Sequence, residues 1–169
     1  PEARDRWGCN IEHQWFTNRG YAVLSVNYRG SSGFGKKFVS AGDLEWGRKM
    51  QDDLYDAVDW AIQNKIADPQ KIAIFGGSYG GYAVLSALTT NPEKFACGVD
   101  IVGISSLTTL YNSMPAYWKP IRDFFHKKIG NPATPEGQRL FKERSPLTYA
   151  HQIKRPLLIG QGANDPRVT

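Results

Sequence analysis

The chain has 169 residues, of which 41% are hydrophobic and 22% are charged, and its net charge is +5. These values are typical of a globular domain with a sizeable core. The basic residues are scattered rather than gathered into a run, so we expect no nucleic-acid partner. No apolar run approaches the ~18 residues of a membrane span, so we expect no membrane insertion. The cysteines and histidines lack the spacing of metal ligands, and we expect no metal site.

Strand-like and helix-like segments alternate along the chain, which predicts a parallel sheet covered by helices. In chain order we expect a helix over 7–18, a buried strand over 21–28, a helix over 51–65, a strand over 71–75, a buried helix over 82–90, and strands over 96–104 and 156–160. The segment 105–150 is rich in proline and aromatic residues. It predicts short helices and loops inserted over one end of the sheet.

The segment Gly76-Gly77-Ser78-Tyr79-Gly80 carries the pattern Gly-x-Ser-x-Gly between a predicted strand and a predicted helix. A nucleophilic serine must project from a sharp, strained turn at the carboxyl end of a strand, so its close neighbours must lack side chains. Gly76, Gly80 and Gly81 are expected to leave that room. The start of the helix offers free N–H groups, and that of Tyr79 can stabilise an oxyanion. The alternative is a plain glycine-rich turn.

Asp165 lies in the loop after the strand predicted over 156–160. A serine hydroxyl needs a histidine to take its proton and a carboxylate to orient that histidine. Where the serine stands on such a strand–turn–helix elbow, the chain order is serine, acid, histidine. Asp165 is therefore the candidate acid, the alternative being a turn aspartate in Asn-Asp-Pro. His13, His126 and His151 all precede it, so we expect the base to lie outside this sequence.

The chain resembles the catalytic domain of the prolyl oligopeptidase family of serine peptidases, and most of all its acylaminoacyl-peptidase and dipeptidyl-peptidase branches. Four motifs carry the resemblance: Asn27-Tyr28-Arg29-Gly30-Ser31, Gly76-Gly77-Ser78-Tyr79-Gly80-Gly81-Tyr82, Ser145-Pro146-Leu147 and Gly162-Ala163-Asn164-Asp165-Pro166-Arg167-Val168. The resemblance implies a partial α/β-hydrolase fold, with a mostly parallel sheet and helices on both faces. Residues 1–169 are then part of a peptidase catalytic domain.

The resemblance also implies roles for individual residues. Ser78 matches the family nucleophile and Asp165 the acid, while Tyr79 matches an oxyanion donor through its N–H and a pocket wall through its ring. Arg167 matches an arginine that binds a substrate carbonyl in some members, the alternative being a surface loop arginine. The remaining positions implied to line the substrate pocket are Ile104, Leu107, Leu110 and Val168.

Several family parts are not in this sequence. The family's His-Gly-Gly-Pro oxyanion loop is expected just before the chain, with Pro1 as its last residue. The first strands, a β-propeller that restricts substrate size and the unit with the catalytic histidine are also missing. We therefore expect this chain to need the remainder of a longer protein as its partner and to be inactive alone. Unpaired strand edges would be covered by that remainder or by a second copy, so a homo-oligomer stays open.

The leading interpretation is a serine peptidase that hydrolyses short peptides through an acyl-enzyme on Ser78, with no metal or organic cofactor. One alternative is a carboxylesterase, which would share the elbow and the acid. Tyr79 and the run Asn-Asp-Pro-Arg-Val favour the peptidase. The other alternative is a binding module without catalysis, against which the intact elbow argues.

Overall fold

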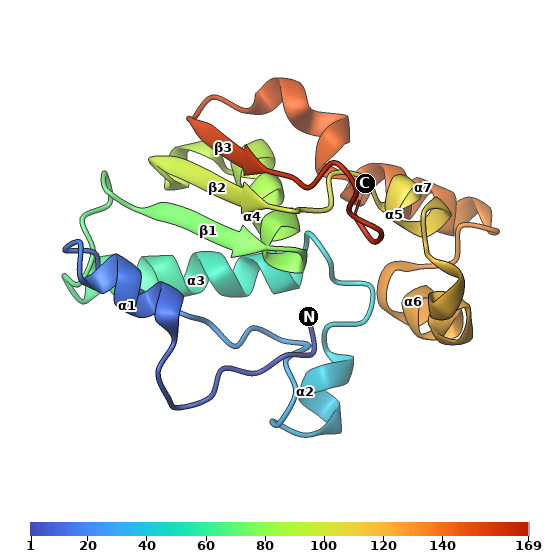
Figure 1. The fold of residues 1–169 in the computed structure, drawn as a ribbon, viewed down its shortest axis with the longest axis horizontal. Coiled ribbons are helices and arrows are strands. Elements are labelled where there is room, and N and C mark those ends of the chain that lie inside the picture. Colours follow the sequence, from blue (N-terminus) through green and yellow to red (C-terminus); the bar gives the residue numbers. More distant parts are fainter. Residues whose placement is uncertain (169) are drawn as a thin grey trace.

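The structure, a computed structural model, describes residues 1–168 and contains a three-stranded parallel sheet with the strand order β1-β2-β3 (Figure 1). The strands are β1 (Ala73–Gly77), β2 (Cys97–Ile101) and β3 (Leu157–Gly160). Gly76 pairs with Asp100, which in turn pairs with Ile159. The predicted parallel sheet is therefore confirmed. Because the strands are parallel, their carboxyl ends lie together at one end of the sheet.

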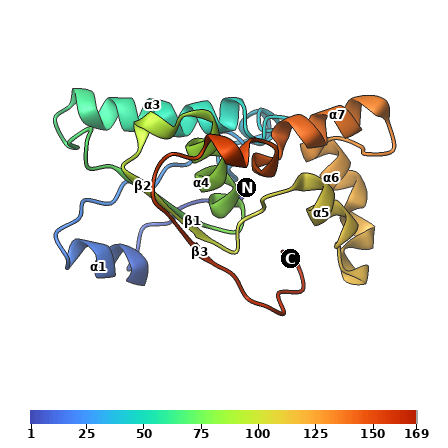
Figure 2. The same cartoon turned by 90° about the horizontal axis from the view of Figure 1, so that it is seen from above.

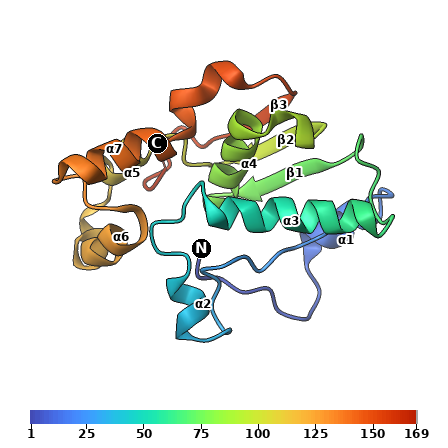
Figure 3. The ribbon, with the colours of Figure 1, turned by 180° about the vertical axis from the view of Figure 1, so that it is seen from behind.

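Helices cover both faces of this sheet. α4 (Tyr79–Thr90) and α3 (Lys49–Gln63) lie on one face, and α1 (Ile11–Thr17) lies on the other (Figures 2 and 3). The strand alternation explains this arrangement, because successive side chains of a strand point to opposite faces. Ile74 of β1 packs into the cluster of α4, whereas the ring of Phe75 lies 5.3 Å from that of Phe16 in α1.

The segment 105–150 forms short helices beside the carboxyl ends of the strands, as predicted (Figure 1). Side-chain caps start two of them: the hydroxyl of Ser106 accepts from the N–H of Thr109, and that of Thr134 accepts from the N–H of Gly137. Such caps satisfy N–H groups that have no partner within the helix. The helices are α5 (Leu107–Asn112), the 3-10 helix η2 (Ala116–Ile121), α6 (Arg122–Ile129), α7 (Pro135–Arg144) and the 3-10 helix η3 (Pro146–Gln152).

Two predicted elements differ most from the structure, and the bounds of the other predicted helices and strands shift by at most three residues. The strand expected over 21–28 is wrong, because this segment pairs with no strand of the described chain, and Leu24 is 52% exposed. An apolar run becomes a strand only where another strand supplies its hydrogen-bonding partners. The first helix begins at Ile11 rather than Trp7, because the side chain of Asn10 accepts from the N–H of His13 and caps it there. The remaining short elements are α2 (Lys36–Ser40) and the 3-10 helix η1 (Pro92–Lys94).

The core consists of two clusters that share helix α4. Val84 and Leu88 of α4 are fully buried and pack with Phe95 beneath the sheet. Tyr79 and Tyr82, at the start of the same helix, belong to a second cluster that extends into the segment 105–150. This arrangement joins the insertion firmly to the sheet at the carboxyl end of β1. Within residues 1–168, no helix is long and apolar enough to cross a membrane.

Candidate active site

The turn at Ser78 has the strained geometry of a nucleophile elbow. Ser78 is exposed and has φ +56° and ψ −115°, a backbone conformation that L residues rarely adopt. Such strain costs of order 1–3 kcal/mol and persists only where the surroundings impose it. The Ser78 N–H donates to the carbonyl of Ile101 at 2.9 Å, which ties the turn to β2.

Two of the three glycines expected to make room for this turn do so. A Cβ at Gly76 would lie 2.5 Å from the carbonyl carbon of Gly80, and a Cβ at Gly81 would lie 2.2 Å from Asp100 Oδ1. The expectation for Gly80 is wrong, because a Cβ there would meet nothing within 4 Å. The close approaches are thus between β1 and α4, and between α4 and β2.

Tyr79 is the first residue of α4, where backbone N–H groups have no acceptor within the helix. Its side chain is 6% exposed, and its ring lies 4.6 Å from that of Trp46 in an edge-on arrangement. Burial, together with the neighbouring phenols of Tyr28 and Tyr82, raises the pKa of Tyr79 well above its usual range. The phenol is therefore uncharged at neutral pH and offers an apolar wall.

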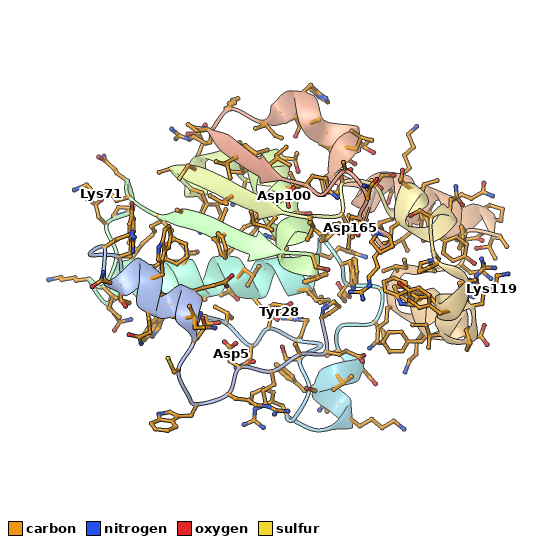
Figure 4. The ribbon with its side chains drawn as sticks, viewed as in Figure 1. Asp5, Tyr28, Lys71, Asp100, Lys119 and Asp165 are labelled. Carbon is orange, nitrogen blue, oxygen red and sulfur yellow. The ribbon has the colours of Figure 1, made fainter. Side chains whose placement is uncertain are left out.

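Asp165 lies in the loop after β3, at the carboxyl end of the sheet (Figure 4). Its Oδ1 accepts hydrogen bonds from the N–H of Arg167 at 2.8 Å and of Val168 at 2.9 Å. The bonds from Val168 and then Arg167 lower the pKa of Asp165. The carboxylate is therefore ionised at neutral pH, and its hydrogen bonds with the backbone hold residues 165–168 in a turn.

A cavity of about 330 Å³ brings most of the predicted site residues together. Leu107 is not among its lining residues, because this side chain is fully buried in the core cluster around Tyr79. No histidine of the described chain lines the cavity, and His126 Nε2 is instead hydrogen-bonded to Tyr111 Oη at 2.8 Å. The predicted residues that do line it are Ser78, Tyr79, Ile104, Leu110, Asp165, Arg167 and Val168.

The cavity has further lining residues that the sequence analysis missed. Trp118 of η2 stacks on Phe125 of α6, with ring centroids 5.5 Å apart. The proline and aromatic content of the segment 105–150 was the sole signal for these side chains, and it did not say where they point. The missed residues are Pro1, Trp46, Val102, Trp118, Phe124, Phe125 and Lys128.

Lys128 is a buried cation in the wall of this cavity, with a side chain that is 6% exposed. Its Nζ lies 2.6 Å from Glu2 Oε1 and 2.7 Å from Asp43 Oδ1. Burial alone would lower the pKa of Lys128, but the hydrogen bonds with Asp43 and Glu2 outweigh burial and raise it. Lys127 adds a second contact to Asp43 at 3.3 Å. The cluster therefore pairs two ammonium groups with two carboxylates.

The motif Asn27–Ser31 supports the Tyr79 side of the cavity. The guanidinium of Arg29 donates to both carboxylate oxygens of Asp53 in α3, at 2.8 and 2.6 Å. The backbone N–H of Arg29 donates a third hydrogen bond to Asp53 Oδ2 at 2.8 Å. The ring of the preceding residue, Tyr28, lies 5.5 Å from that of Tyr79. The ion pair thus fixes the segment that backs Tyr79.

At the rim, Arg167 is exposed, and a hydrogen bond with the hydroxyl of Tyr117 raises its pKa. Tyr117 belongs to η2, and Arg167 and Trp118 of that same 3-10 helix both line the cavity. The loop of Asp165 and the insertion therefore both contribute to the cavity lining.

Comparison with known proteins gives the chain a family. The model of the prolyl oligopeptidase family matches residues 7–169. The chain is 58% identical over 168 residues to dipeptidyl aminopeptidase BIII of Pseudoxanthomonas mexicana and 50% identical over 169 residues to dipeptidyl peptidase family member 6 of Caenorhabditis elegans. Each alignment covers 99% of this chain but 24% and 23% of the relative, so the chain spans about a quarter of their length.

The solved structures agree with this assignment. The puromycin-hydrolyzing peptidase of Mycobacterium tuberculosis superposes with a TM-score of 0.90 at 33% identity, over 99% of this chain and 25% of that chain. The fold is accordingly that of the α/β-hydrolase-type peptidases, as the motifs at Ser78 and Asp165 indicated. This chain belongs to the prolyl oligopeptidase family.

Proposed function

We propose that this chain supplies the nucleophile and the acid of a serine peptidase that cleaves short peptides through an acyl-enzyme on Ser78. One observation carries the proposal: Ser78 and Asp165, from elements far apart in the sequence, line the same cavity. The strained, exposed backbone at Ser78 further supports it, because strain of this kind clusters at reactive positions.

In the proposed reaction, Ser78 Oγ attacks the carbonyl carbon of the peptide while a histidine elsewhere in the full-length protein takes its proton. The Asp165 carboxylate orients that histidine and stabilises its charged form, and the Tyr79 N–H donates to the oxyanion. The histidine then protonates the leaving amine, and water releases the acyl group. We assign substrate carbonyl binding to Arg167, since its guanidinium is exposed at the rim.

The names of the relatives support a short-peptide substrate, because two of them, 58% and 50% identical to this chain, are named as a dipeptidyl aminopeptidase and a dipeptidyl peptidase family member. We infer that the remainder of the full-length protein supplies the histidine, the second oxyanion donor and a propeller domain that limits substrate size. No metal or organic cofactor takes part in the proposed steps, which the side chains and water complete.

The test uses the full-length protein and a fluorophosphonate probe, which reacts with activated serines. We expect labelling of the native protein and of Ser25→Ala, an exposed serine outside the cavity, and none of Ser78→Ala. Native protein that has not been exposed to the probe is then assayed on a peptide amide and on a short acyl ester. Cleavage of the ester alone would contradict the peptidase and support a carboxylesterase, and absence of labelling would support a binding module.

A further inference from the structure

Glu2 is a strained residue next to the cavity of Ser78. It has φ +63°, a backbone conformation that residues with a side chain rarely adopt. Rotation about the N–Cα bond of Glu2 moves Pro1 relative to Ala3, and Pro1 lines the same cavity as Ser78. Pro1 accordingly lies between the carboxyl end of β1 and α2 (Figures 1 and 3). The place of this part of the cavity wall therefore depends on one strained dihedral angle.

The backbone that follows this strained residue is anchored to the segment 27–32. The carbonyl oxygen of Ala3 accepts a hydrogen bond from the N–H of Ser32 at 3.2 Å. The N–H of Asp5 donates to Asn27 Oδ1 at 2.9 Å. A change of the strained φ would therefore displace the cavity wall that precedes it, while the anchored residues would stay in place.

The ammonium group of Lys128 holds the strained residue from the opposite side. Lys128 Nζ lies 2.6 Å from Glu2 Oε1 and 2.7 Å from Asp43 Oδ1, and it donates to the carbonyl oxygen of Val39 at 3.5 Å. The carbonyl oxygen of Lys128 in turn accepts from the N–H of Leu44 at 2.9 Å. In the part of the chain that the structure describes, Lys128 is the sole cation paired with Glu2.

This ion cluster is largely shielded from water. The side chains of Lys128, Asp43 and Glu2 are 6%, 20% and 29% exposed, so salt and solvent screen their charges weakly. The carboxylates of Glu2 and Asp43 reach the same ammonium, and like charges at such short range repel each other without it. Loss of the ammonium would therefore drive Glu2 out of its present place and release its strained backbone.

We propose that Lys128 is a positioning residue of the proposed reaction and that it acts through Glu2. By holding Glu2 in its strained conformation, Lys128 keeps the backbone at Pro1 at the distance from Ser78 that the reacting carbonyl needs. The three N–H groups of the ammonium already have acceptors, so Lys128 sets geometry and takes no part in proton transfer. The inference rests on the proposed function, because it takes Ser78 as the nucleophile.

The experiment uses the full-length protein and two measurements: the rate of fluorophosphonate labelling at Ser78, and kcat and KM on the peptide amide of the preceding test. Both rates are expressed per serine that the probe titrates to completion in a separate sample, so that unfolded protein does not enter them. Glu2→Ala removes the held carboxylate and leaves Lys128 paired with Asp43. We expect the labelling rate and kcat to fall by about tenfold to a hundredfold, because the reacting groups are misplaced. KM should stay within about threefold, since binding of the peptide is not what changes.

A second variant and a matched control test whether Lys128 acts through this contact. Lys128→Met keeps the apolar stem, removes the ammonium and should lower both rates as Glu2→Ala does. The double variant should be no slower than the slower single variant, because both substitutions break the same contact. The control is Lys127→Met, which removes a 59% exposed lysine that contacts the other oxygen of Asp43. It should leave both rates within about threefold of native.

The outcomes separate this inference from the proposed function. Native rates for Glu2→Ala would overturn the role of Lys128, and they would do so even if Lys128→Met fails to fold. Losses that multiply in the double variant, or a rise of KM with native kcat, would overturn it as well. Each of these results leaves Ser78 labelled and the peptidase intact. If the native protein is neither labelled nor active, the proposed function is rejected and the role of Lys128 with it.

Discussion

Gly81 in α4 and Asp100 in β2 approach so closely that a Cβ at position 81 would lie 2.2 Å from Asp100 Oδ1. Asp100 lies within the sheet (labelled in Figure 4). It is 2% exposed, and its Oδ1 has no hydrogen-bond partner within the described chain. Burial raises the pKa of this carboxyl, against a hydrogen bond from the Gly103 backbone that lowers it. The helix that begins after Ser78 is thus seated on β2 without room for a methyl group.

Gly81→Ala is therefore expected to destabilise the protein by about 1–3 kcal/mol, the usual cost of overpacking a tight contact. Gly80→Ala is the matched control, because its Cβ would meet nothing within 4 Å. Alanine is favoured over glycine in helices, so this variant should match or slightly exceed the native stability. Urea unfolding of the full-length protein measures both, and equal losses at the two positions would contradict the seating of α4 on β2.

Gly76→Ala should disturb the elbow, because its Cβ would lie 2.5 Å from the backbone of Gly80. We expect the rate of fluorophosphonate labelling at Ser78 to fall by about a hundredfold, as misplacing a reacting group by about 1 Å does. Gly77→Ala is the control, since its closest contact would be an ordinary 3.7 Å to the carbonyl oxygen of Ile101. Rapid labelling of Gly76→Ala would show that the elbow tolerates a side chain there.

Asp165→Asn should distinguish two roles of Asp165, which are to orient the catalytic histidine and to hold its own loop in place. The asparagine keeps an acceptor for the N–H groups of Arg167 and Val168, so the loop and the cavity wall at Val168 should persist. Loss of the negative charge is expected to lower kcat by about ten-thousand-fold.

Asp165→Ala removes the acceptor as well, so it should release Val168 from the cavity wall and also raise KM for a peptide substrate. The two variants are compared by steady-state kinetics of the full-length protein. A native kcat for Asp165→Asn would exclude Asp165 as the acid.

The ion pair of Arg29 and Asp53 should contribute to stability at neutral pH. Burial favours the protonated form of Asp53, but the hydrogen bonds from Arg29 outweigh burial and lower the pKa of this carboxyl below its ordinary 3.8. A depressed carboxyl pKa stabilises the folded state above the ordinary value, and this contribution is lost as the pH falls through the folded pKa. Asp53→Asn should cost about 1–2 kcal/mol near neutral pH, allowing for partial solvent exposure of the pair.

The difference between native protein and Asp53→Asn should shrink as the pH falls below about 4. Asp56→Asn, an exposed aspartate of the same helix, is the control and should leave the unfolding free energy within about 0.5 kcal/mol at every pH. A constant difference across the pH range would mean that packing rather than charge carries the effect.

Local signals explain which parts of the fold could be predicted. The strands around Ile74 and Val99 and the buried helix after Ser78 follow from short apolar runs with glycine and proline at their ends. The start of α1 could not be placed as well, because the stripe at Trp7 and Ile11 suggested a longer helix than the cap at Asn10 allows. The apolar run over 21–28 failed as a strand because pairing depends on a neighbour that periodicity does not reveal.

The same distinction between local signals and tertiary packing applies to the residues of the candidate site. Ser78 and Asp165 could be found because their chemistry requires particular residues at particular places in a strand–loop pattern. Trp46 and Trp118 could not, because tertiary packing alone decides that they face Ser78 across a cavity. Leu107 and Leu110 belong to the same core cluster, and only Leu110 also lines the cavity, a difference that sequence spacing does not reveal.

The positive φ at Ser78 lowers the stability of the fold, yet the reaction needs the serine hydroxyl at this strained position. Glycine adopts that conformation without strain, so Ser78→Gly should fold more stably than the native protein while having no hydroxyl to react. Val102, a β-branched residue with φ +50° in the same cavity, is strained in the same way. Random mutagenesis screened for thermal tolerance alone would therefore enrich inactive sequences at position 78, and a screen for durable variants must select for turnover at the same time.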